Sequence, residues 1–143
     1  MTAPRSRKET KLYNKHRSAL DKTRCTFCDI DEHDAEFVRE EHGFKIIRNK
    51  FPYSIWDSQR VVDHLMIVPV QHTDTLADLT PEQATHYLKL VGAYEQQGYN
   101  LYARAPGSVI KTIVHQHSHL IKTEGAPKKL VFLLRKPYIR VTF

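Results

Sequence analysis

The chain has 143 residues, the length of one domain, and with 41% hydrophobic and 27% charged residues it can bury a core without disulfides. Its longest apolar runs, residues 65–70 and 130–134, fall well short of the roughly 18 residues that a membrane helix needs. The basic start has no apolar stretch behind it, as a secretory signal would. These features exclude membrane, secreted and collagen-like proteins, and predict a cytoplasmic one.

The net charge of +6 is concentrated at the N-terminus. Residues 1–24 contain eight Lys or Arg residues against Glu9 and Asp21, whereas residues 25–143 contain fourteen residues of each sign. We therefore expect a flexible, solvated basic tail followed by a single domain over residues 25–143. The alternative for the tail is an electrostatic arm for nucleic acid or another polyanion, with only Tyr13 available for base stacking.

The first predicted elements are two short strands at residues 36–40 and 44–48, joined by a His-Gly turn at 42–43 as in a β-hairpin. A polar loop is predicted for residues 54–63. The continuous apolar run at residues 64–69 is typical of a central strand.

The clearest local signal is a helix over residues 81–97. Thr80 is suited to the N-cap, Pro81 to the first helical position and Gln83 to the third, which together make a capping box. Apolar residues then follow at helical spacing, and Gly98 is a suitable stop.

Strands are predicted after this helix at residues 100–103 and 112–122, and two further β-rich pieces at residues 129–134 and 138–143. Short links between many strands and few helices predict the α+β class. We expect an antiparallel sheet of about five strands with one long helix and short flanking helices.

Two cysteines, Cys25 and Cys28, form a C-x-x-C pair. Without a secretory context such a pair indicates a metal half-site or a redox pair rather than a disulfide. A thioredoxin-like pair would follow a strand and open a helix, whereas here the polar, acidic segment 29–34 follows. A metal site is therefore favoured, with two further ligands to be found, and a redox pair is the alternative.

Residues 113–120 have the sequence Ile-Val-His-Gln-His-Ser-His-Leu. In a strand, His115, His117 and His119 would share one face, with side chains two apart separated by about 6.6 Å and those four apart by about 13 Å. Because zinc–nitrogen bonds are about 2.0–2.1 Å, the outer pair cannot share one ion. In one interpretation the histidines bind a single metal, and at least one of them is not a ligand. In the other, one histidine is a metal ligand, one is a nucleophile and one contacts phosphate.

This pattern resembles the histidine-triad (HIT) family of nucleotide hydrolases and transferases, over a stretch from Cys25 to about residue 123. The C-x-x-C pair is similar to the start of the zinc-containing bacterial members. Residues 64–72 resemble the family's strand, which begins with a histidine and closes on a proline and a second histidine. Residues 115–121 fill the triad signature.

The resemblance implies a zinc ion held by the two cysteines, by the histidine after the proline and by the first triad histidine: Cys25, Cys28, His72 and His115. Two thiolates and two imidazoles close a tetrahedral site, which suits a structural ion rather than a catalytic one. We expect about one zinc per chain.

The resemblance also implies that His117 is the nucleophile. A neutral imidazole, with a reference pKa near 6.5, can attack the α-phosphorus of a nucleotide and form a nucleotidyl-histidine, from which water or phosphate then takes the nucleotide. His64 and His119 are the candidates for stabilising charge on the phosphoryl oxygens, with a buried packing role as the alternative for His64. Asn49 resembles an asparagine that lies near the ribose hydroxyls in some branches.

The chain departs from the family pattern just before the triad. Many members carry a Gln-Ser pair before the triad that contacts phosphate or the leaving group, and here Lys111 and Thr112 stand at that spacing. Thr112 keeps a hydroxyl. The charge of Lys111 either favours a more anionic leaving group, such as a polyphosphate, or lies in solvent.

The implied activity is hydrolysis or nucleotidyl transfer on a nucleoside phosphoanhydride, phosphoramidate or dinucleoside polyphosphate, by a homodimer. One alternative is phosphorolysis of a dinucleoside polyphosphate, with inorganic phosphate in place of water. The other is a non-catalytic module that binds nucleotide or RNA, in which the basic tail contacts the nucleic acid.

Overall fold

The structure is a computed structural model that describes residues 5, 7–21, 23–109 and 111–127. Its helical elements are α1 (Arg7–Ala19), α2 (Thr26–Asp29), the 3-10 helix η1 (Leu76–Asp78) and α3 (Pro81–Glu95). Its strands are β1 (Phe37–Glu41), β2 (Phe44–Arg48), β3 (Ile55–Trp56), β4 (Gln59–Pro69), β5 (Tyr99–Ala103) and β6 (Ser118–Glu124).

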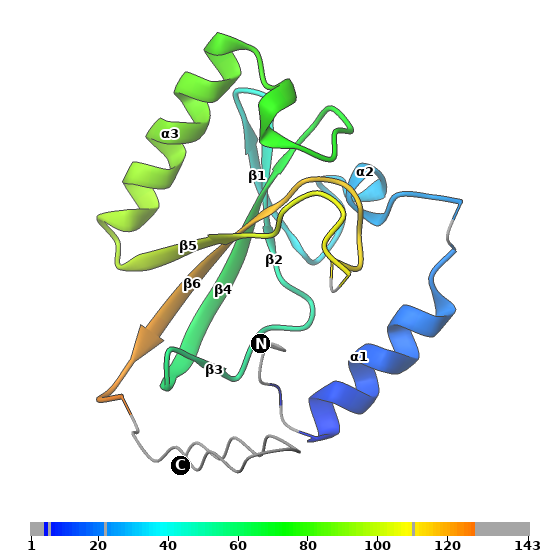
Figure 1. The fold of residues 1–143 in the computed structure, drawn as a ribbon, viewed down its shortest axis with the longest axis vertical. Coiled ribbons are helices and arrows are strands. Elements are labelled where there is room, and N and C mark those ends of the chain that lie inside the picture. The colour runs from blue at the N-terminus through cyan, green and yellow to red at the C-terminus, as the bar shows by residue number, and fades with distance from the viewer. Residues whose placement is uncertain (1–4, 6, 22, 110, 128–143) are drawn as a thin grey trace.

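The strands form one antiparallel sheet in the order β1-β2-β4-β6-β5, and the short β3 pairs with the start of β4. Figure 1 shows α3 running beside β5, with α1 on the opposite side of the molecule. The α+β class, the antiparallel sheet and the one long α-helix that packs on it are therefore confirmed.

The alternation of side chains along β2 and β4 gives the sheet two different faces. One face packs against α3 through Phe44, Ile46, Leu65, Ile67, Leu120, Tyr87, Leu90 and Tyr94. The other face packs against α2 through a smaller cluster formed by Phe27, Ile47, Met66 and Val68. Because His64 lies two residues before Met66, and His119 lies opposite Met66 in the sheet, both histidines are on this second face.

The two clearest turn and helix signals are confirmed. His42 and Gly43 join β1 to β2 with backbone φ angles of 49° and 80°, as a two-residue turn with both central residues left-handed requires. At α3, Thr80 Oγ1 accepts from the Gln83 N–H at 3.2 Å, and Gln83 Oε1 accepts from the Thr80 N–H at 2.9 Å. The predicted end is also close, since the helix stops three residues before Gly98.

The loop predicted at residues 54–63 is wrong. Ile55 and Trp56 form β3, and β4 begins at Gln59, five residues before the predicted strand. The turn between them is made by an Asp-Ser pair with φ angles of 47° and 64°. Its sequence lacks the Asn-Gly or Asp-Gly signal that usually marks such a turn, so the segment looks like a polar loop.

The strand predicted at residues 112–122 is wrong in its first half, because β6 begins only at Ser118. Before it, the backbone pairs with another loop: the Gln116 N–H donates to the Thr73 carbonyl at 2.6 Å. Two of the three triad histidines therefore lie before the strand, and only His119 lies within it.

Helix α1 falls within the predicted basic tail, and its contacts with the sheet domain are described below. The domain boundary at residue 24 stays a prediction. The strands predicted at residues 129–134 and 138–143 lie outside the described residues. Over the described part of the chain, no helix is long and apolar enough to cross a bilayer.

Candidate functional site

Two cysteines and two histidines from three parts of the chain converge beside α2. Cys25 and Cys28 bracket the first turn of that helix, His72 follows β4, and His115 precedes β6. Their ligand atoms all lie within 4.8 Å of one another. The Nδ1 atom of His115 is 3.4 Å from the Cys25 Sγ and 3.5 Å from the Cys28 Sγ, and the His72 Nδ1 is 3.3 Å from the Cys28 Sγ.

These four groups fit a tetrahedral metal ion. Bonds of about 2.3 Å to sulfur and about 2.0–2.1 Å to nitrogen place the two kinds of ligand atom roughly 3.5 Å apart in a tetrahedron, close to the measured spacings. The His115 ring also has a partner for its other nitrogen, because Nε2 lies 3.0 Å from the Pro69 carbonyl. That bond puts the ring proton on Nε2 and leaves the Nδ1 lone pair facing the two sulfurs.

A buried lysine holds the segment that carries the two cysteines. The Lys45 ammonium donates to the carbonyls of Phe27 at 3.3 Å, Cys28 at 3.4 Å and Ile30 at 2.5 Å. Lys45 is only 8% exposed, and three carbonyl acceptors satisfy all three of its donors. It therefore fixes the C-terminal end of α2, where the carbonyl oxygens of a helix are otherwise unpaired.

A cavity of about 770 Å³ lies next to the metal cluster, between α1, the segment 104–113 and the second face of the sheet. Five of the predicted site residues line it: Asn49, Lys111, Thr112, His117 and His119. None of the four cluster residues does, so the ion and the cavity are separate sites. His64 is not at the cavity wall either, and lies behind His119.

His117 is buried, and its hydrogen bonding fixes which nitrogen is available. Nδ1 lies 2.8 Å from the backbone carbonyl of His115, an acceptor, so Nδ1 carries the proton of the neutral ring and Nε2 keeps a lone pair. Burial lowers the pKa of His117, the hydrogen bond to the His115 carbonyl opposes this shift, and the positive charges of Lys111 and Arg104 add to the lowering. The ring is therefore neutral near pH 7, with an unprotonated nitrogen in the wall of the cavity.

A chain of hydrogen bonds fixes the protons of the other two histidines. The backbone N–H of Tyr53 donates to the His64 Nδ1 at 3.2 Å, so the proton of a neutral His64 is on Nε2. This Nε2 lies 2.9 Å from the His119 Nδ1, to which it donates. His119 then carries its own proton on Nε2 and can donate it into the cavity. Burial keeps both rings neutral: it lowers the pKa of His64 to about 3 and that of His119 well below its usual value.

Solved structures of other proteins share this arrangement of strands and helices, although no family model and no curated protein matches the sequence. A hypothetical histidine triad nucleotide-binding protein from Sulfolobus tokodaii superimposes with a TM-score of 0.56 at 24% identity, over 82% of this chain and 80% of that one. A zinc-bound histidine triad family protein from Mycobacterium smegmatis gives 0.55 at 21% identity, over 74% and 79%. A HIT family hydrolase from Legionella pneumophila gives 0.53 at 21% identity, over 74% and 96%.

The chain has the histidine-triad fold. The resemblance inferred from three short motifs is confirmed at the level of the fold, and one of the structures that share it is zinc-bound. Within the histidine-triad fold of this chain, the four cluster residues lie together as the motifs predict.

The three remaining predicted residues occupy the rim of the cavity in different ways. Asn49 Oδ1 accepts from the Phe51 N–H at 2.9 Å, so this amide braces the turn after β2. The Lys111 ammonium donates to the Gln116 Oε1 at 2.9 Å and to the Asp74 carbonyl at 3.1 Å. Lys111 is thus held at the cavity wall rather than free in solvent. The Thr112 hydroxyl is bonded to α1, as described below.

Several cavity residues were not predicted from the sequence as residues of the site. Arg104 follows β5, and Arg5, Tyr13 and Arg17 belong to the predicted basic tail, yet all four line the cavity. A helix that turns a polar face to a cavity shows no apolar stripe, so hydrophobic periodicity does not detect it. The basic composition of the tail was the available clue, and it indicated charge without a location.

Proposed function

We propose that this chain is a nucleotide hydrolase or nucleotidyl transferase in which His117 attacks the α-phosphorus of a nucleoside phosphoanhydride, phosphoramidate or dinucleoside polyphosphate. The observation that carries the proposal is the bond from the His117 Nδ1 to the His115 carbonyl. In a neutral ring this bond leaves a lone pair on Nε2, which is what a nucleophile requires, and His117 lines the cavity. The solved structures of similar fold include a HIT family hydrolase and a histidine triad nucleotide-binding protein, and this supports the assignment.

The reaction has two displacements at phosphorus. In the first, the His117 Nε2–P bond forms as the bond from phosphorus to the leaving group breaks, and the leaving group departs with the electron pair. In the second, water attacks the nucleotidyl-histidine, the P–Nε2 bond breaks, and a nucleoside monophosphate leaves while the water proton passes to solvent. Splitting one displacement into two gives each step a better nucleophile or a better leaving group.

His119 is the proposed donor to the phosphoryl oxygens. Its Nε2–H is directed by the bond from His64 to its Nδ1, and a donor held in place before the reaction stabilises the charge that develops on those oxygens. His64 is then a positioning residue, since it acts through His119. The predicted packing alternative for His64 describes its burial but leaves this bond unexplained.

The cavity suits a nucleoside at one end. Phe27, Ile30, Ile47, Met66 and Ile113 line its apolar part, which can receive a base by burial of apolar surface. Asn49 lies at the wall of the same cavity, where we place the ribose. Lys111 and Thr112 are proposed contacts for the phosphates or the leaving group.

We further propose that the ion of the Cys25, Cys28, His72 and His115 cluster is a structural zinc. Two sulfur and two nitrogen donors leave no open position on a tetrahedral ion, so it supplies a crosslink between α2, the end of β4 and the triad segment. The zinc-bound structure of similar fold supports this choice of metal.

The test is to trap the intermediate. Purified protein is incubated with substrates labelled at the α-phosphate, denatured at alkaline pH, where a phosphorus–nitrogen bond survives, and weighed intact. We expect the wild type to gain the mass of one nucleotidyl group and to lose it with turnover. His117→Ala should gain none and should lose turnover by about 1000-fold or more.

His33→Ala is the matched control, since this histidine is exposed and does not line the cavity; it should behave as wild type. The released product identifies the second step: a nucleoside monophosphate indicates water as the acceptor, and a diphosphate indicates phosphorolysis. Binding of nucleotide with neither an adduct nor turnover would instead identify a non-catalytic module.

A further inference from the structure

Helix α1 presents one of its faces to the cavity. Thr10, Tyr13, Asn14 and Arg17 line the same cavity as His117, and their spacing of three, one and three residues is that of a single helical face. The next turn of the chain continues the face with Leu20 and Asp21. The N-terminal segment is therefore a wall of the proposed active site.

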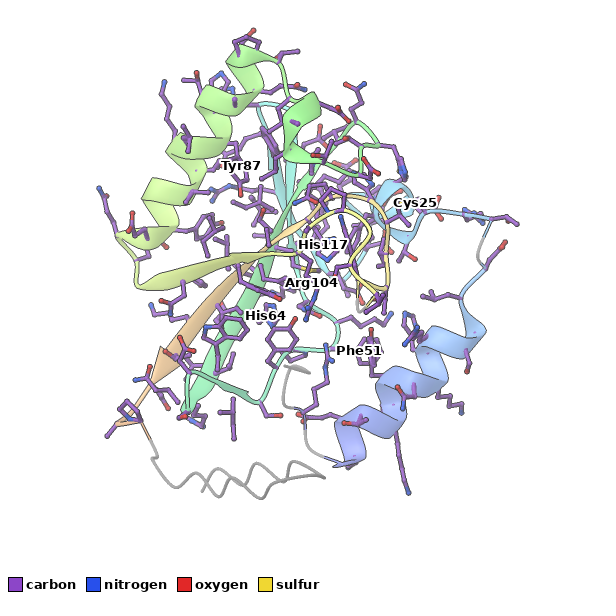
Figure 2. The ribbon with its side chains drawn as sticks, viewed as in Figure 1. Cys25, Phe51, His64, Tyr87, Arg104 and His117 are labelled. Carbon is purple, nitrogen blue, oxygen red and sulfur yellow. The ribbon has the colours of Figure 1, made fainter. Side chains whose placement is uncertain are left out.

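The contacts that hold α1 in place converge on the segment after β2. The Phe51 ring meets the Tyr13 ring edge-on at a centroid distance of 5.6 Å and the His16 ring at 4.9 Å, and Figure 2 shows it between the sheet domain and α1. The Arg5 guanidinium donates to the Phe51 carbonyl at 2.8 and 3.1 Å and lies 4.4 Å over the Tyr13 ring. Ser54 adds a bond of 2.6 Å to Glu9.

One contact joins α1 directly to a predicted substrate-binding residue. The Tyr13 hydroxyl donates to the Thr112 Oγ1 at 3.1 Å. This hydrogen bond runs from α1 to the segment just before the triad, so α1 lies beside Thr112, a proposed contact for the phosphates or the leaving group.

Burial of apolar surface does not account for this placement. None of residues 8–19 of α1 is buried, Leu12 is 52% exposed, and the face toward the cavity is polar apart from the Tyr13 ring. A helix of 13 residues that is polar on all sides is marginal alone. A polar helix face that lines a cavity is suited to bind a polar ligand in that cavity.

The charges around the cavity show which kind of ligand. Some of its cationic side chains have carboxylate partners, in the pairs Arg24–Asp29, Arg48–Asp63 and Lys50–Glu36. Four others, Arg5, Arg17, Arg104 and Lys111, have no carboxylate partner among the residues that the structure describes. Of these, Arg5 is held by the Phe51 carbonyl, which leaves three. A nucleotide with one phosphate already has the two histidines to receive it, so three further cations suit additional phosphates.

We infer that α1 is the wall that recognises the leaving group, that Arg17 contacts it with Tyr13 beside, and that this leaving group carries phosphate. The inference rests on the proposed function and narrows it: among the candidate substrates it favours a polyphosphate over a phosphoramidate with a neutral amine. Residues 7–19 thereby become part of the substrate site rather than a separate arm.

The test compares two substrates that differ only in the leaving group, a dinucleoside tetraphosphate and a nucleoside phosphoramidate of an uncharged amine. The variants are Arg17→Gln and, as the control, Lys15→Gln, which removes the same charge from an exposed position of α1 outside the cavity lining. Loss of one charged hydrogen bond should lower the specificity constant of Arg17→Gln for the tetraphosphate about 10-fold more than for the phosphoramidate. Lys15→Gln should not change that ratio.

Equal losses for both substrates, or no loss, would overturn the inference while leaving the proposed function intact. A wild type that turns over neither substrate would overturn the proposed function. In that case, titration of the tetraphosphate into His117→Ala, with and without Arg17→Gln, still tests whether α1 contacts the ligand. Equal affinities of the two proteins for the tetraphosphate would overturn the inference.

Discussion

A single backbone group, the N–H of Tyr53, determines where the protons lie on two histidines. It donates to the His64 Nδ1, which forces the His64 proton onto Nε2 and makes it a donor to His119. The carbonyl of His115 fixes His117 in the same way. In the proposed mechanism these two backbone groups together decide which histidine nitrogen attacks and which one donates.

The burial of His64 has a consequence for stability against acid. Its pKa falls to about 3 in the fold, because of burial first and of the nearby Arg5 charge second, with Asp63 opposing, whereas an unfolded histidine titrates near 6.5. Between these values the unfolded chain takes up a proton that the folded chain refuses. The free energy of unfolding should therefore fall as the pH falls from about 6.5 toward 3, by up to about 1.4 kcal/mol per pH unit from this residue.

Denaturant unfolding at several pH values between 7 and 4 measures this slope. Acid also protonates the metal ligands, so the informative quantity is the difference between wild type and His64→Gln, which share the same cluster. The variant should have the shallower slope. Identical slopes would mean that His64 is not held neutral by the fold.

At the scale of elements, α2 depends on Lys45 more than on its own length. Four residues make one helical turn with a single buried side chain, Phe27, and the three carbonyls that Lys45 caps are the only described acceptors for its ammonium. Lys45→Met keeps the bulk and removes the donors. We expect the cysteine loop to loosen and zinc to pass to a competing chelator at least about 10-fold faster.

Lys50→Met is the matched control, because that lysine forms an exposed ion pair with Glu36, a kind of contact that contributes little to stability. Its zinc should leave at the wild-type rate. The measurement is the absorbance of a chromogenic chelator mixed with zinc-loaded protein; equal rates for the two variants would remove the assigned role of Lys45.

Elements with a local cause were predictable from sequence, and those with a distant cause were not. The capping box of α3 and the turn at residues 42–43 are complete within a few residues, so the pattern contains the whole signal. The sequence of the segment before β6 alternates in polarity as a strand does. In the structure, however, the Gln116 N–H donates to the loop after β4, and the His115 ring contacts the cysteines. Those partners are distant in the sequence, so no local pattern shows them.

The residues of the candidate site also fall into a predictable group and an unpredictable one. The cysteines and histidines were found because ligands and nucleophiles are rare residue types at telling spacings. Arg17, Arg104 and Tyr13 were missed because a cation or a tyrosine in a polar segment has many uses. Only the fold shows that α1 lies against the cavity.

For the whole molecule, the metal cluster and the proposed active site are linked through one residue. The His115 side chain belongs to the cluster, and its carbonyl orients the ring of His117. Removing the ion with a chelator should therefore lower both the melting temperature and the activity, although no cluster residue lines the cavity.

A change of metal should have a much smaller effect than its removal. Cadmium accepts the same sulfur and nitrogen donors, so reconstitution with it should restore the turnover rate to within several-fold of the zinc protein. Steady-state kinetics and thermal melts of zinc-loaded, cadmium-loaded and chelated protein make the comparison. If the fully loaded cadmium protein turned over about 100-fold more slowly, the ion would take part in the chemistry.

The homodimer and the binding of nucleic acid by residues 1–24 stay predictions.

The register of β4 sets where the chain tolerates a change in length. Its pairing with β6 slips between Val61 and Asp63, and beyond the slip the residues alternate strictly between the two sheet faces. One residue inserted after Asp63 would turn His64 and Met66 toward α3 and expose the opposite set to the cavity. One residue added at the tip between β3 and β4 would lengthen only a surface hairpin, so homologous chains of different length should differ at that tip and keep the stretch from His64 to Pro69 constant in length.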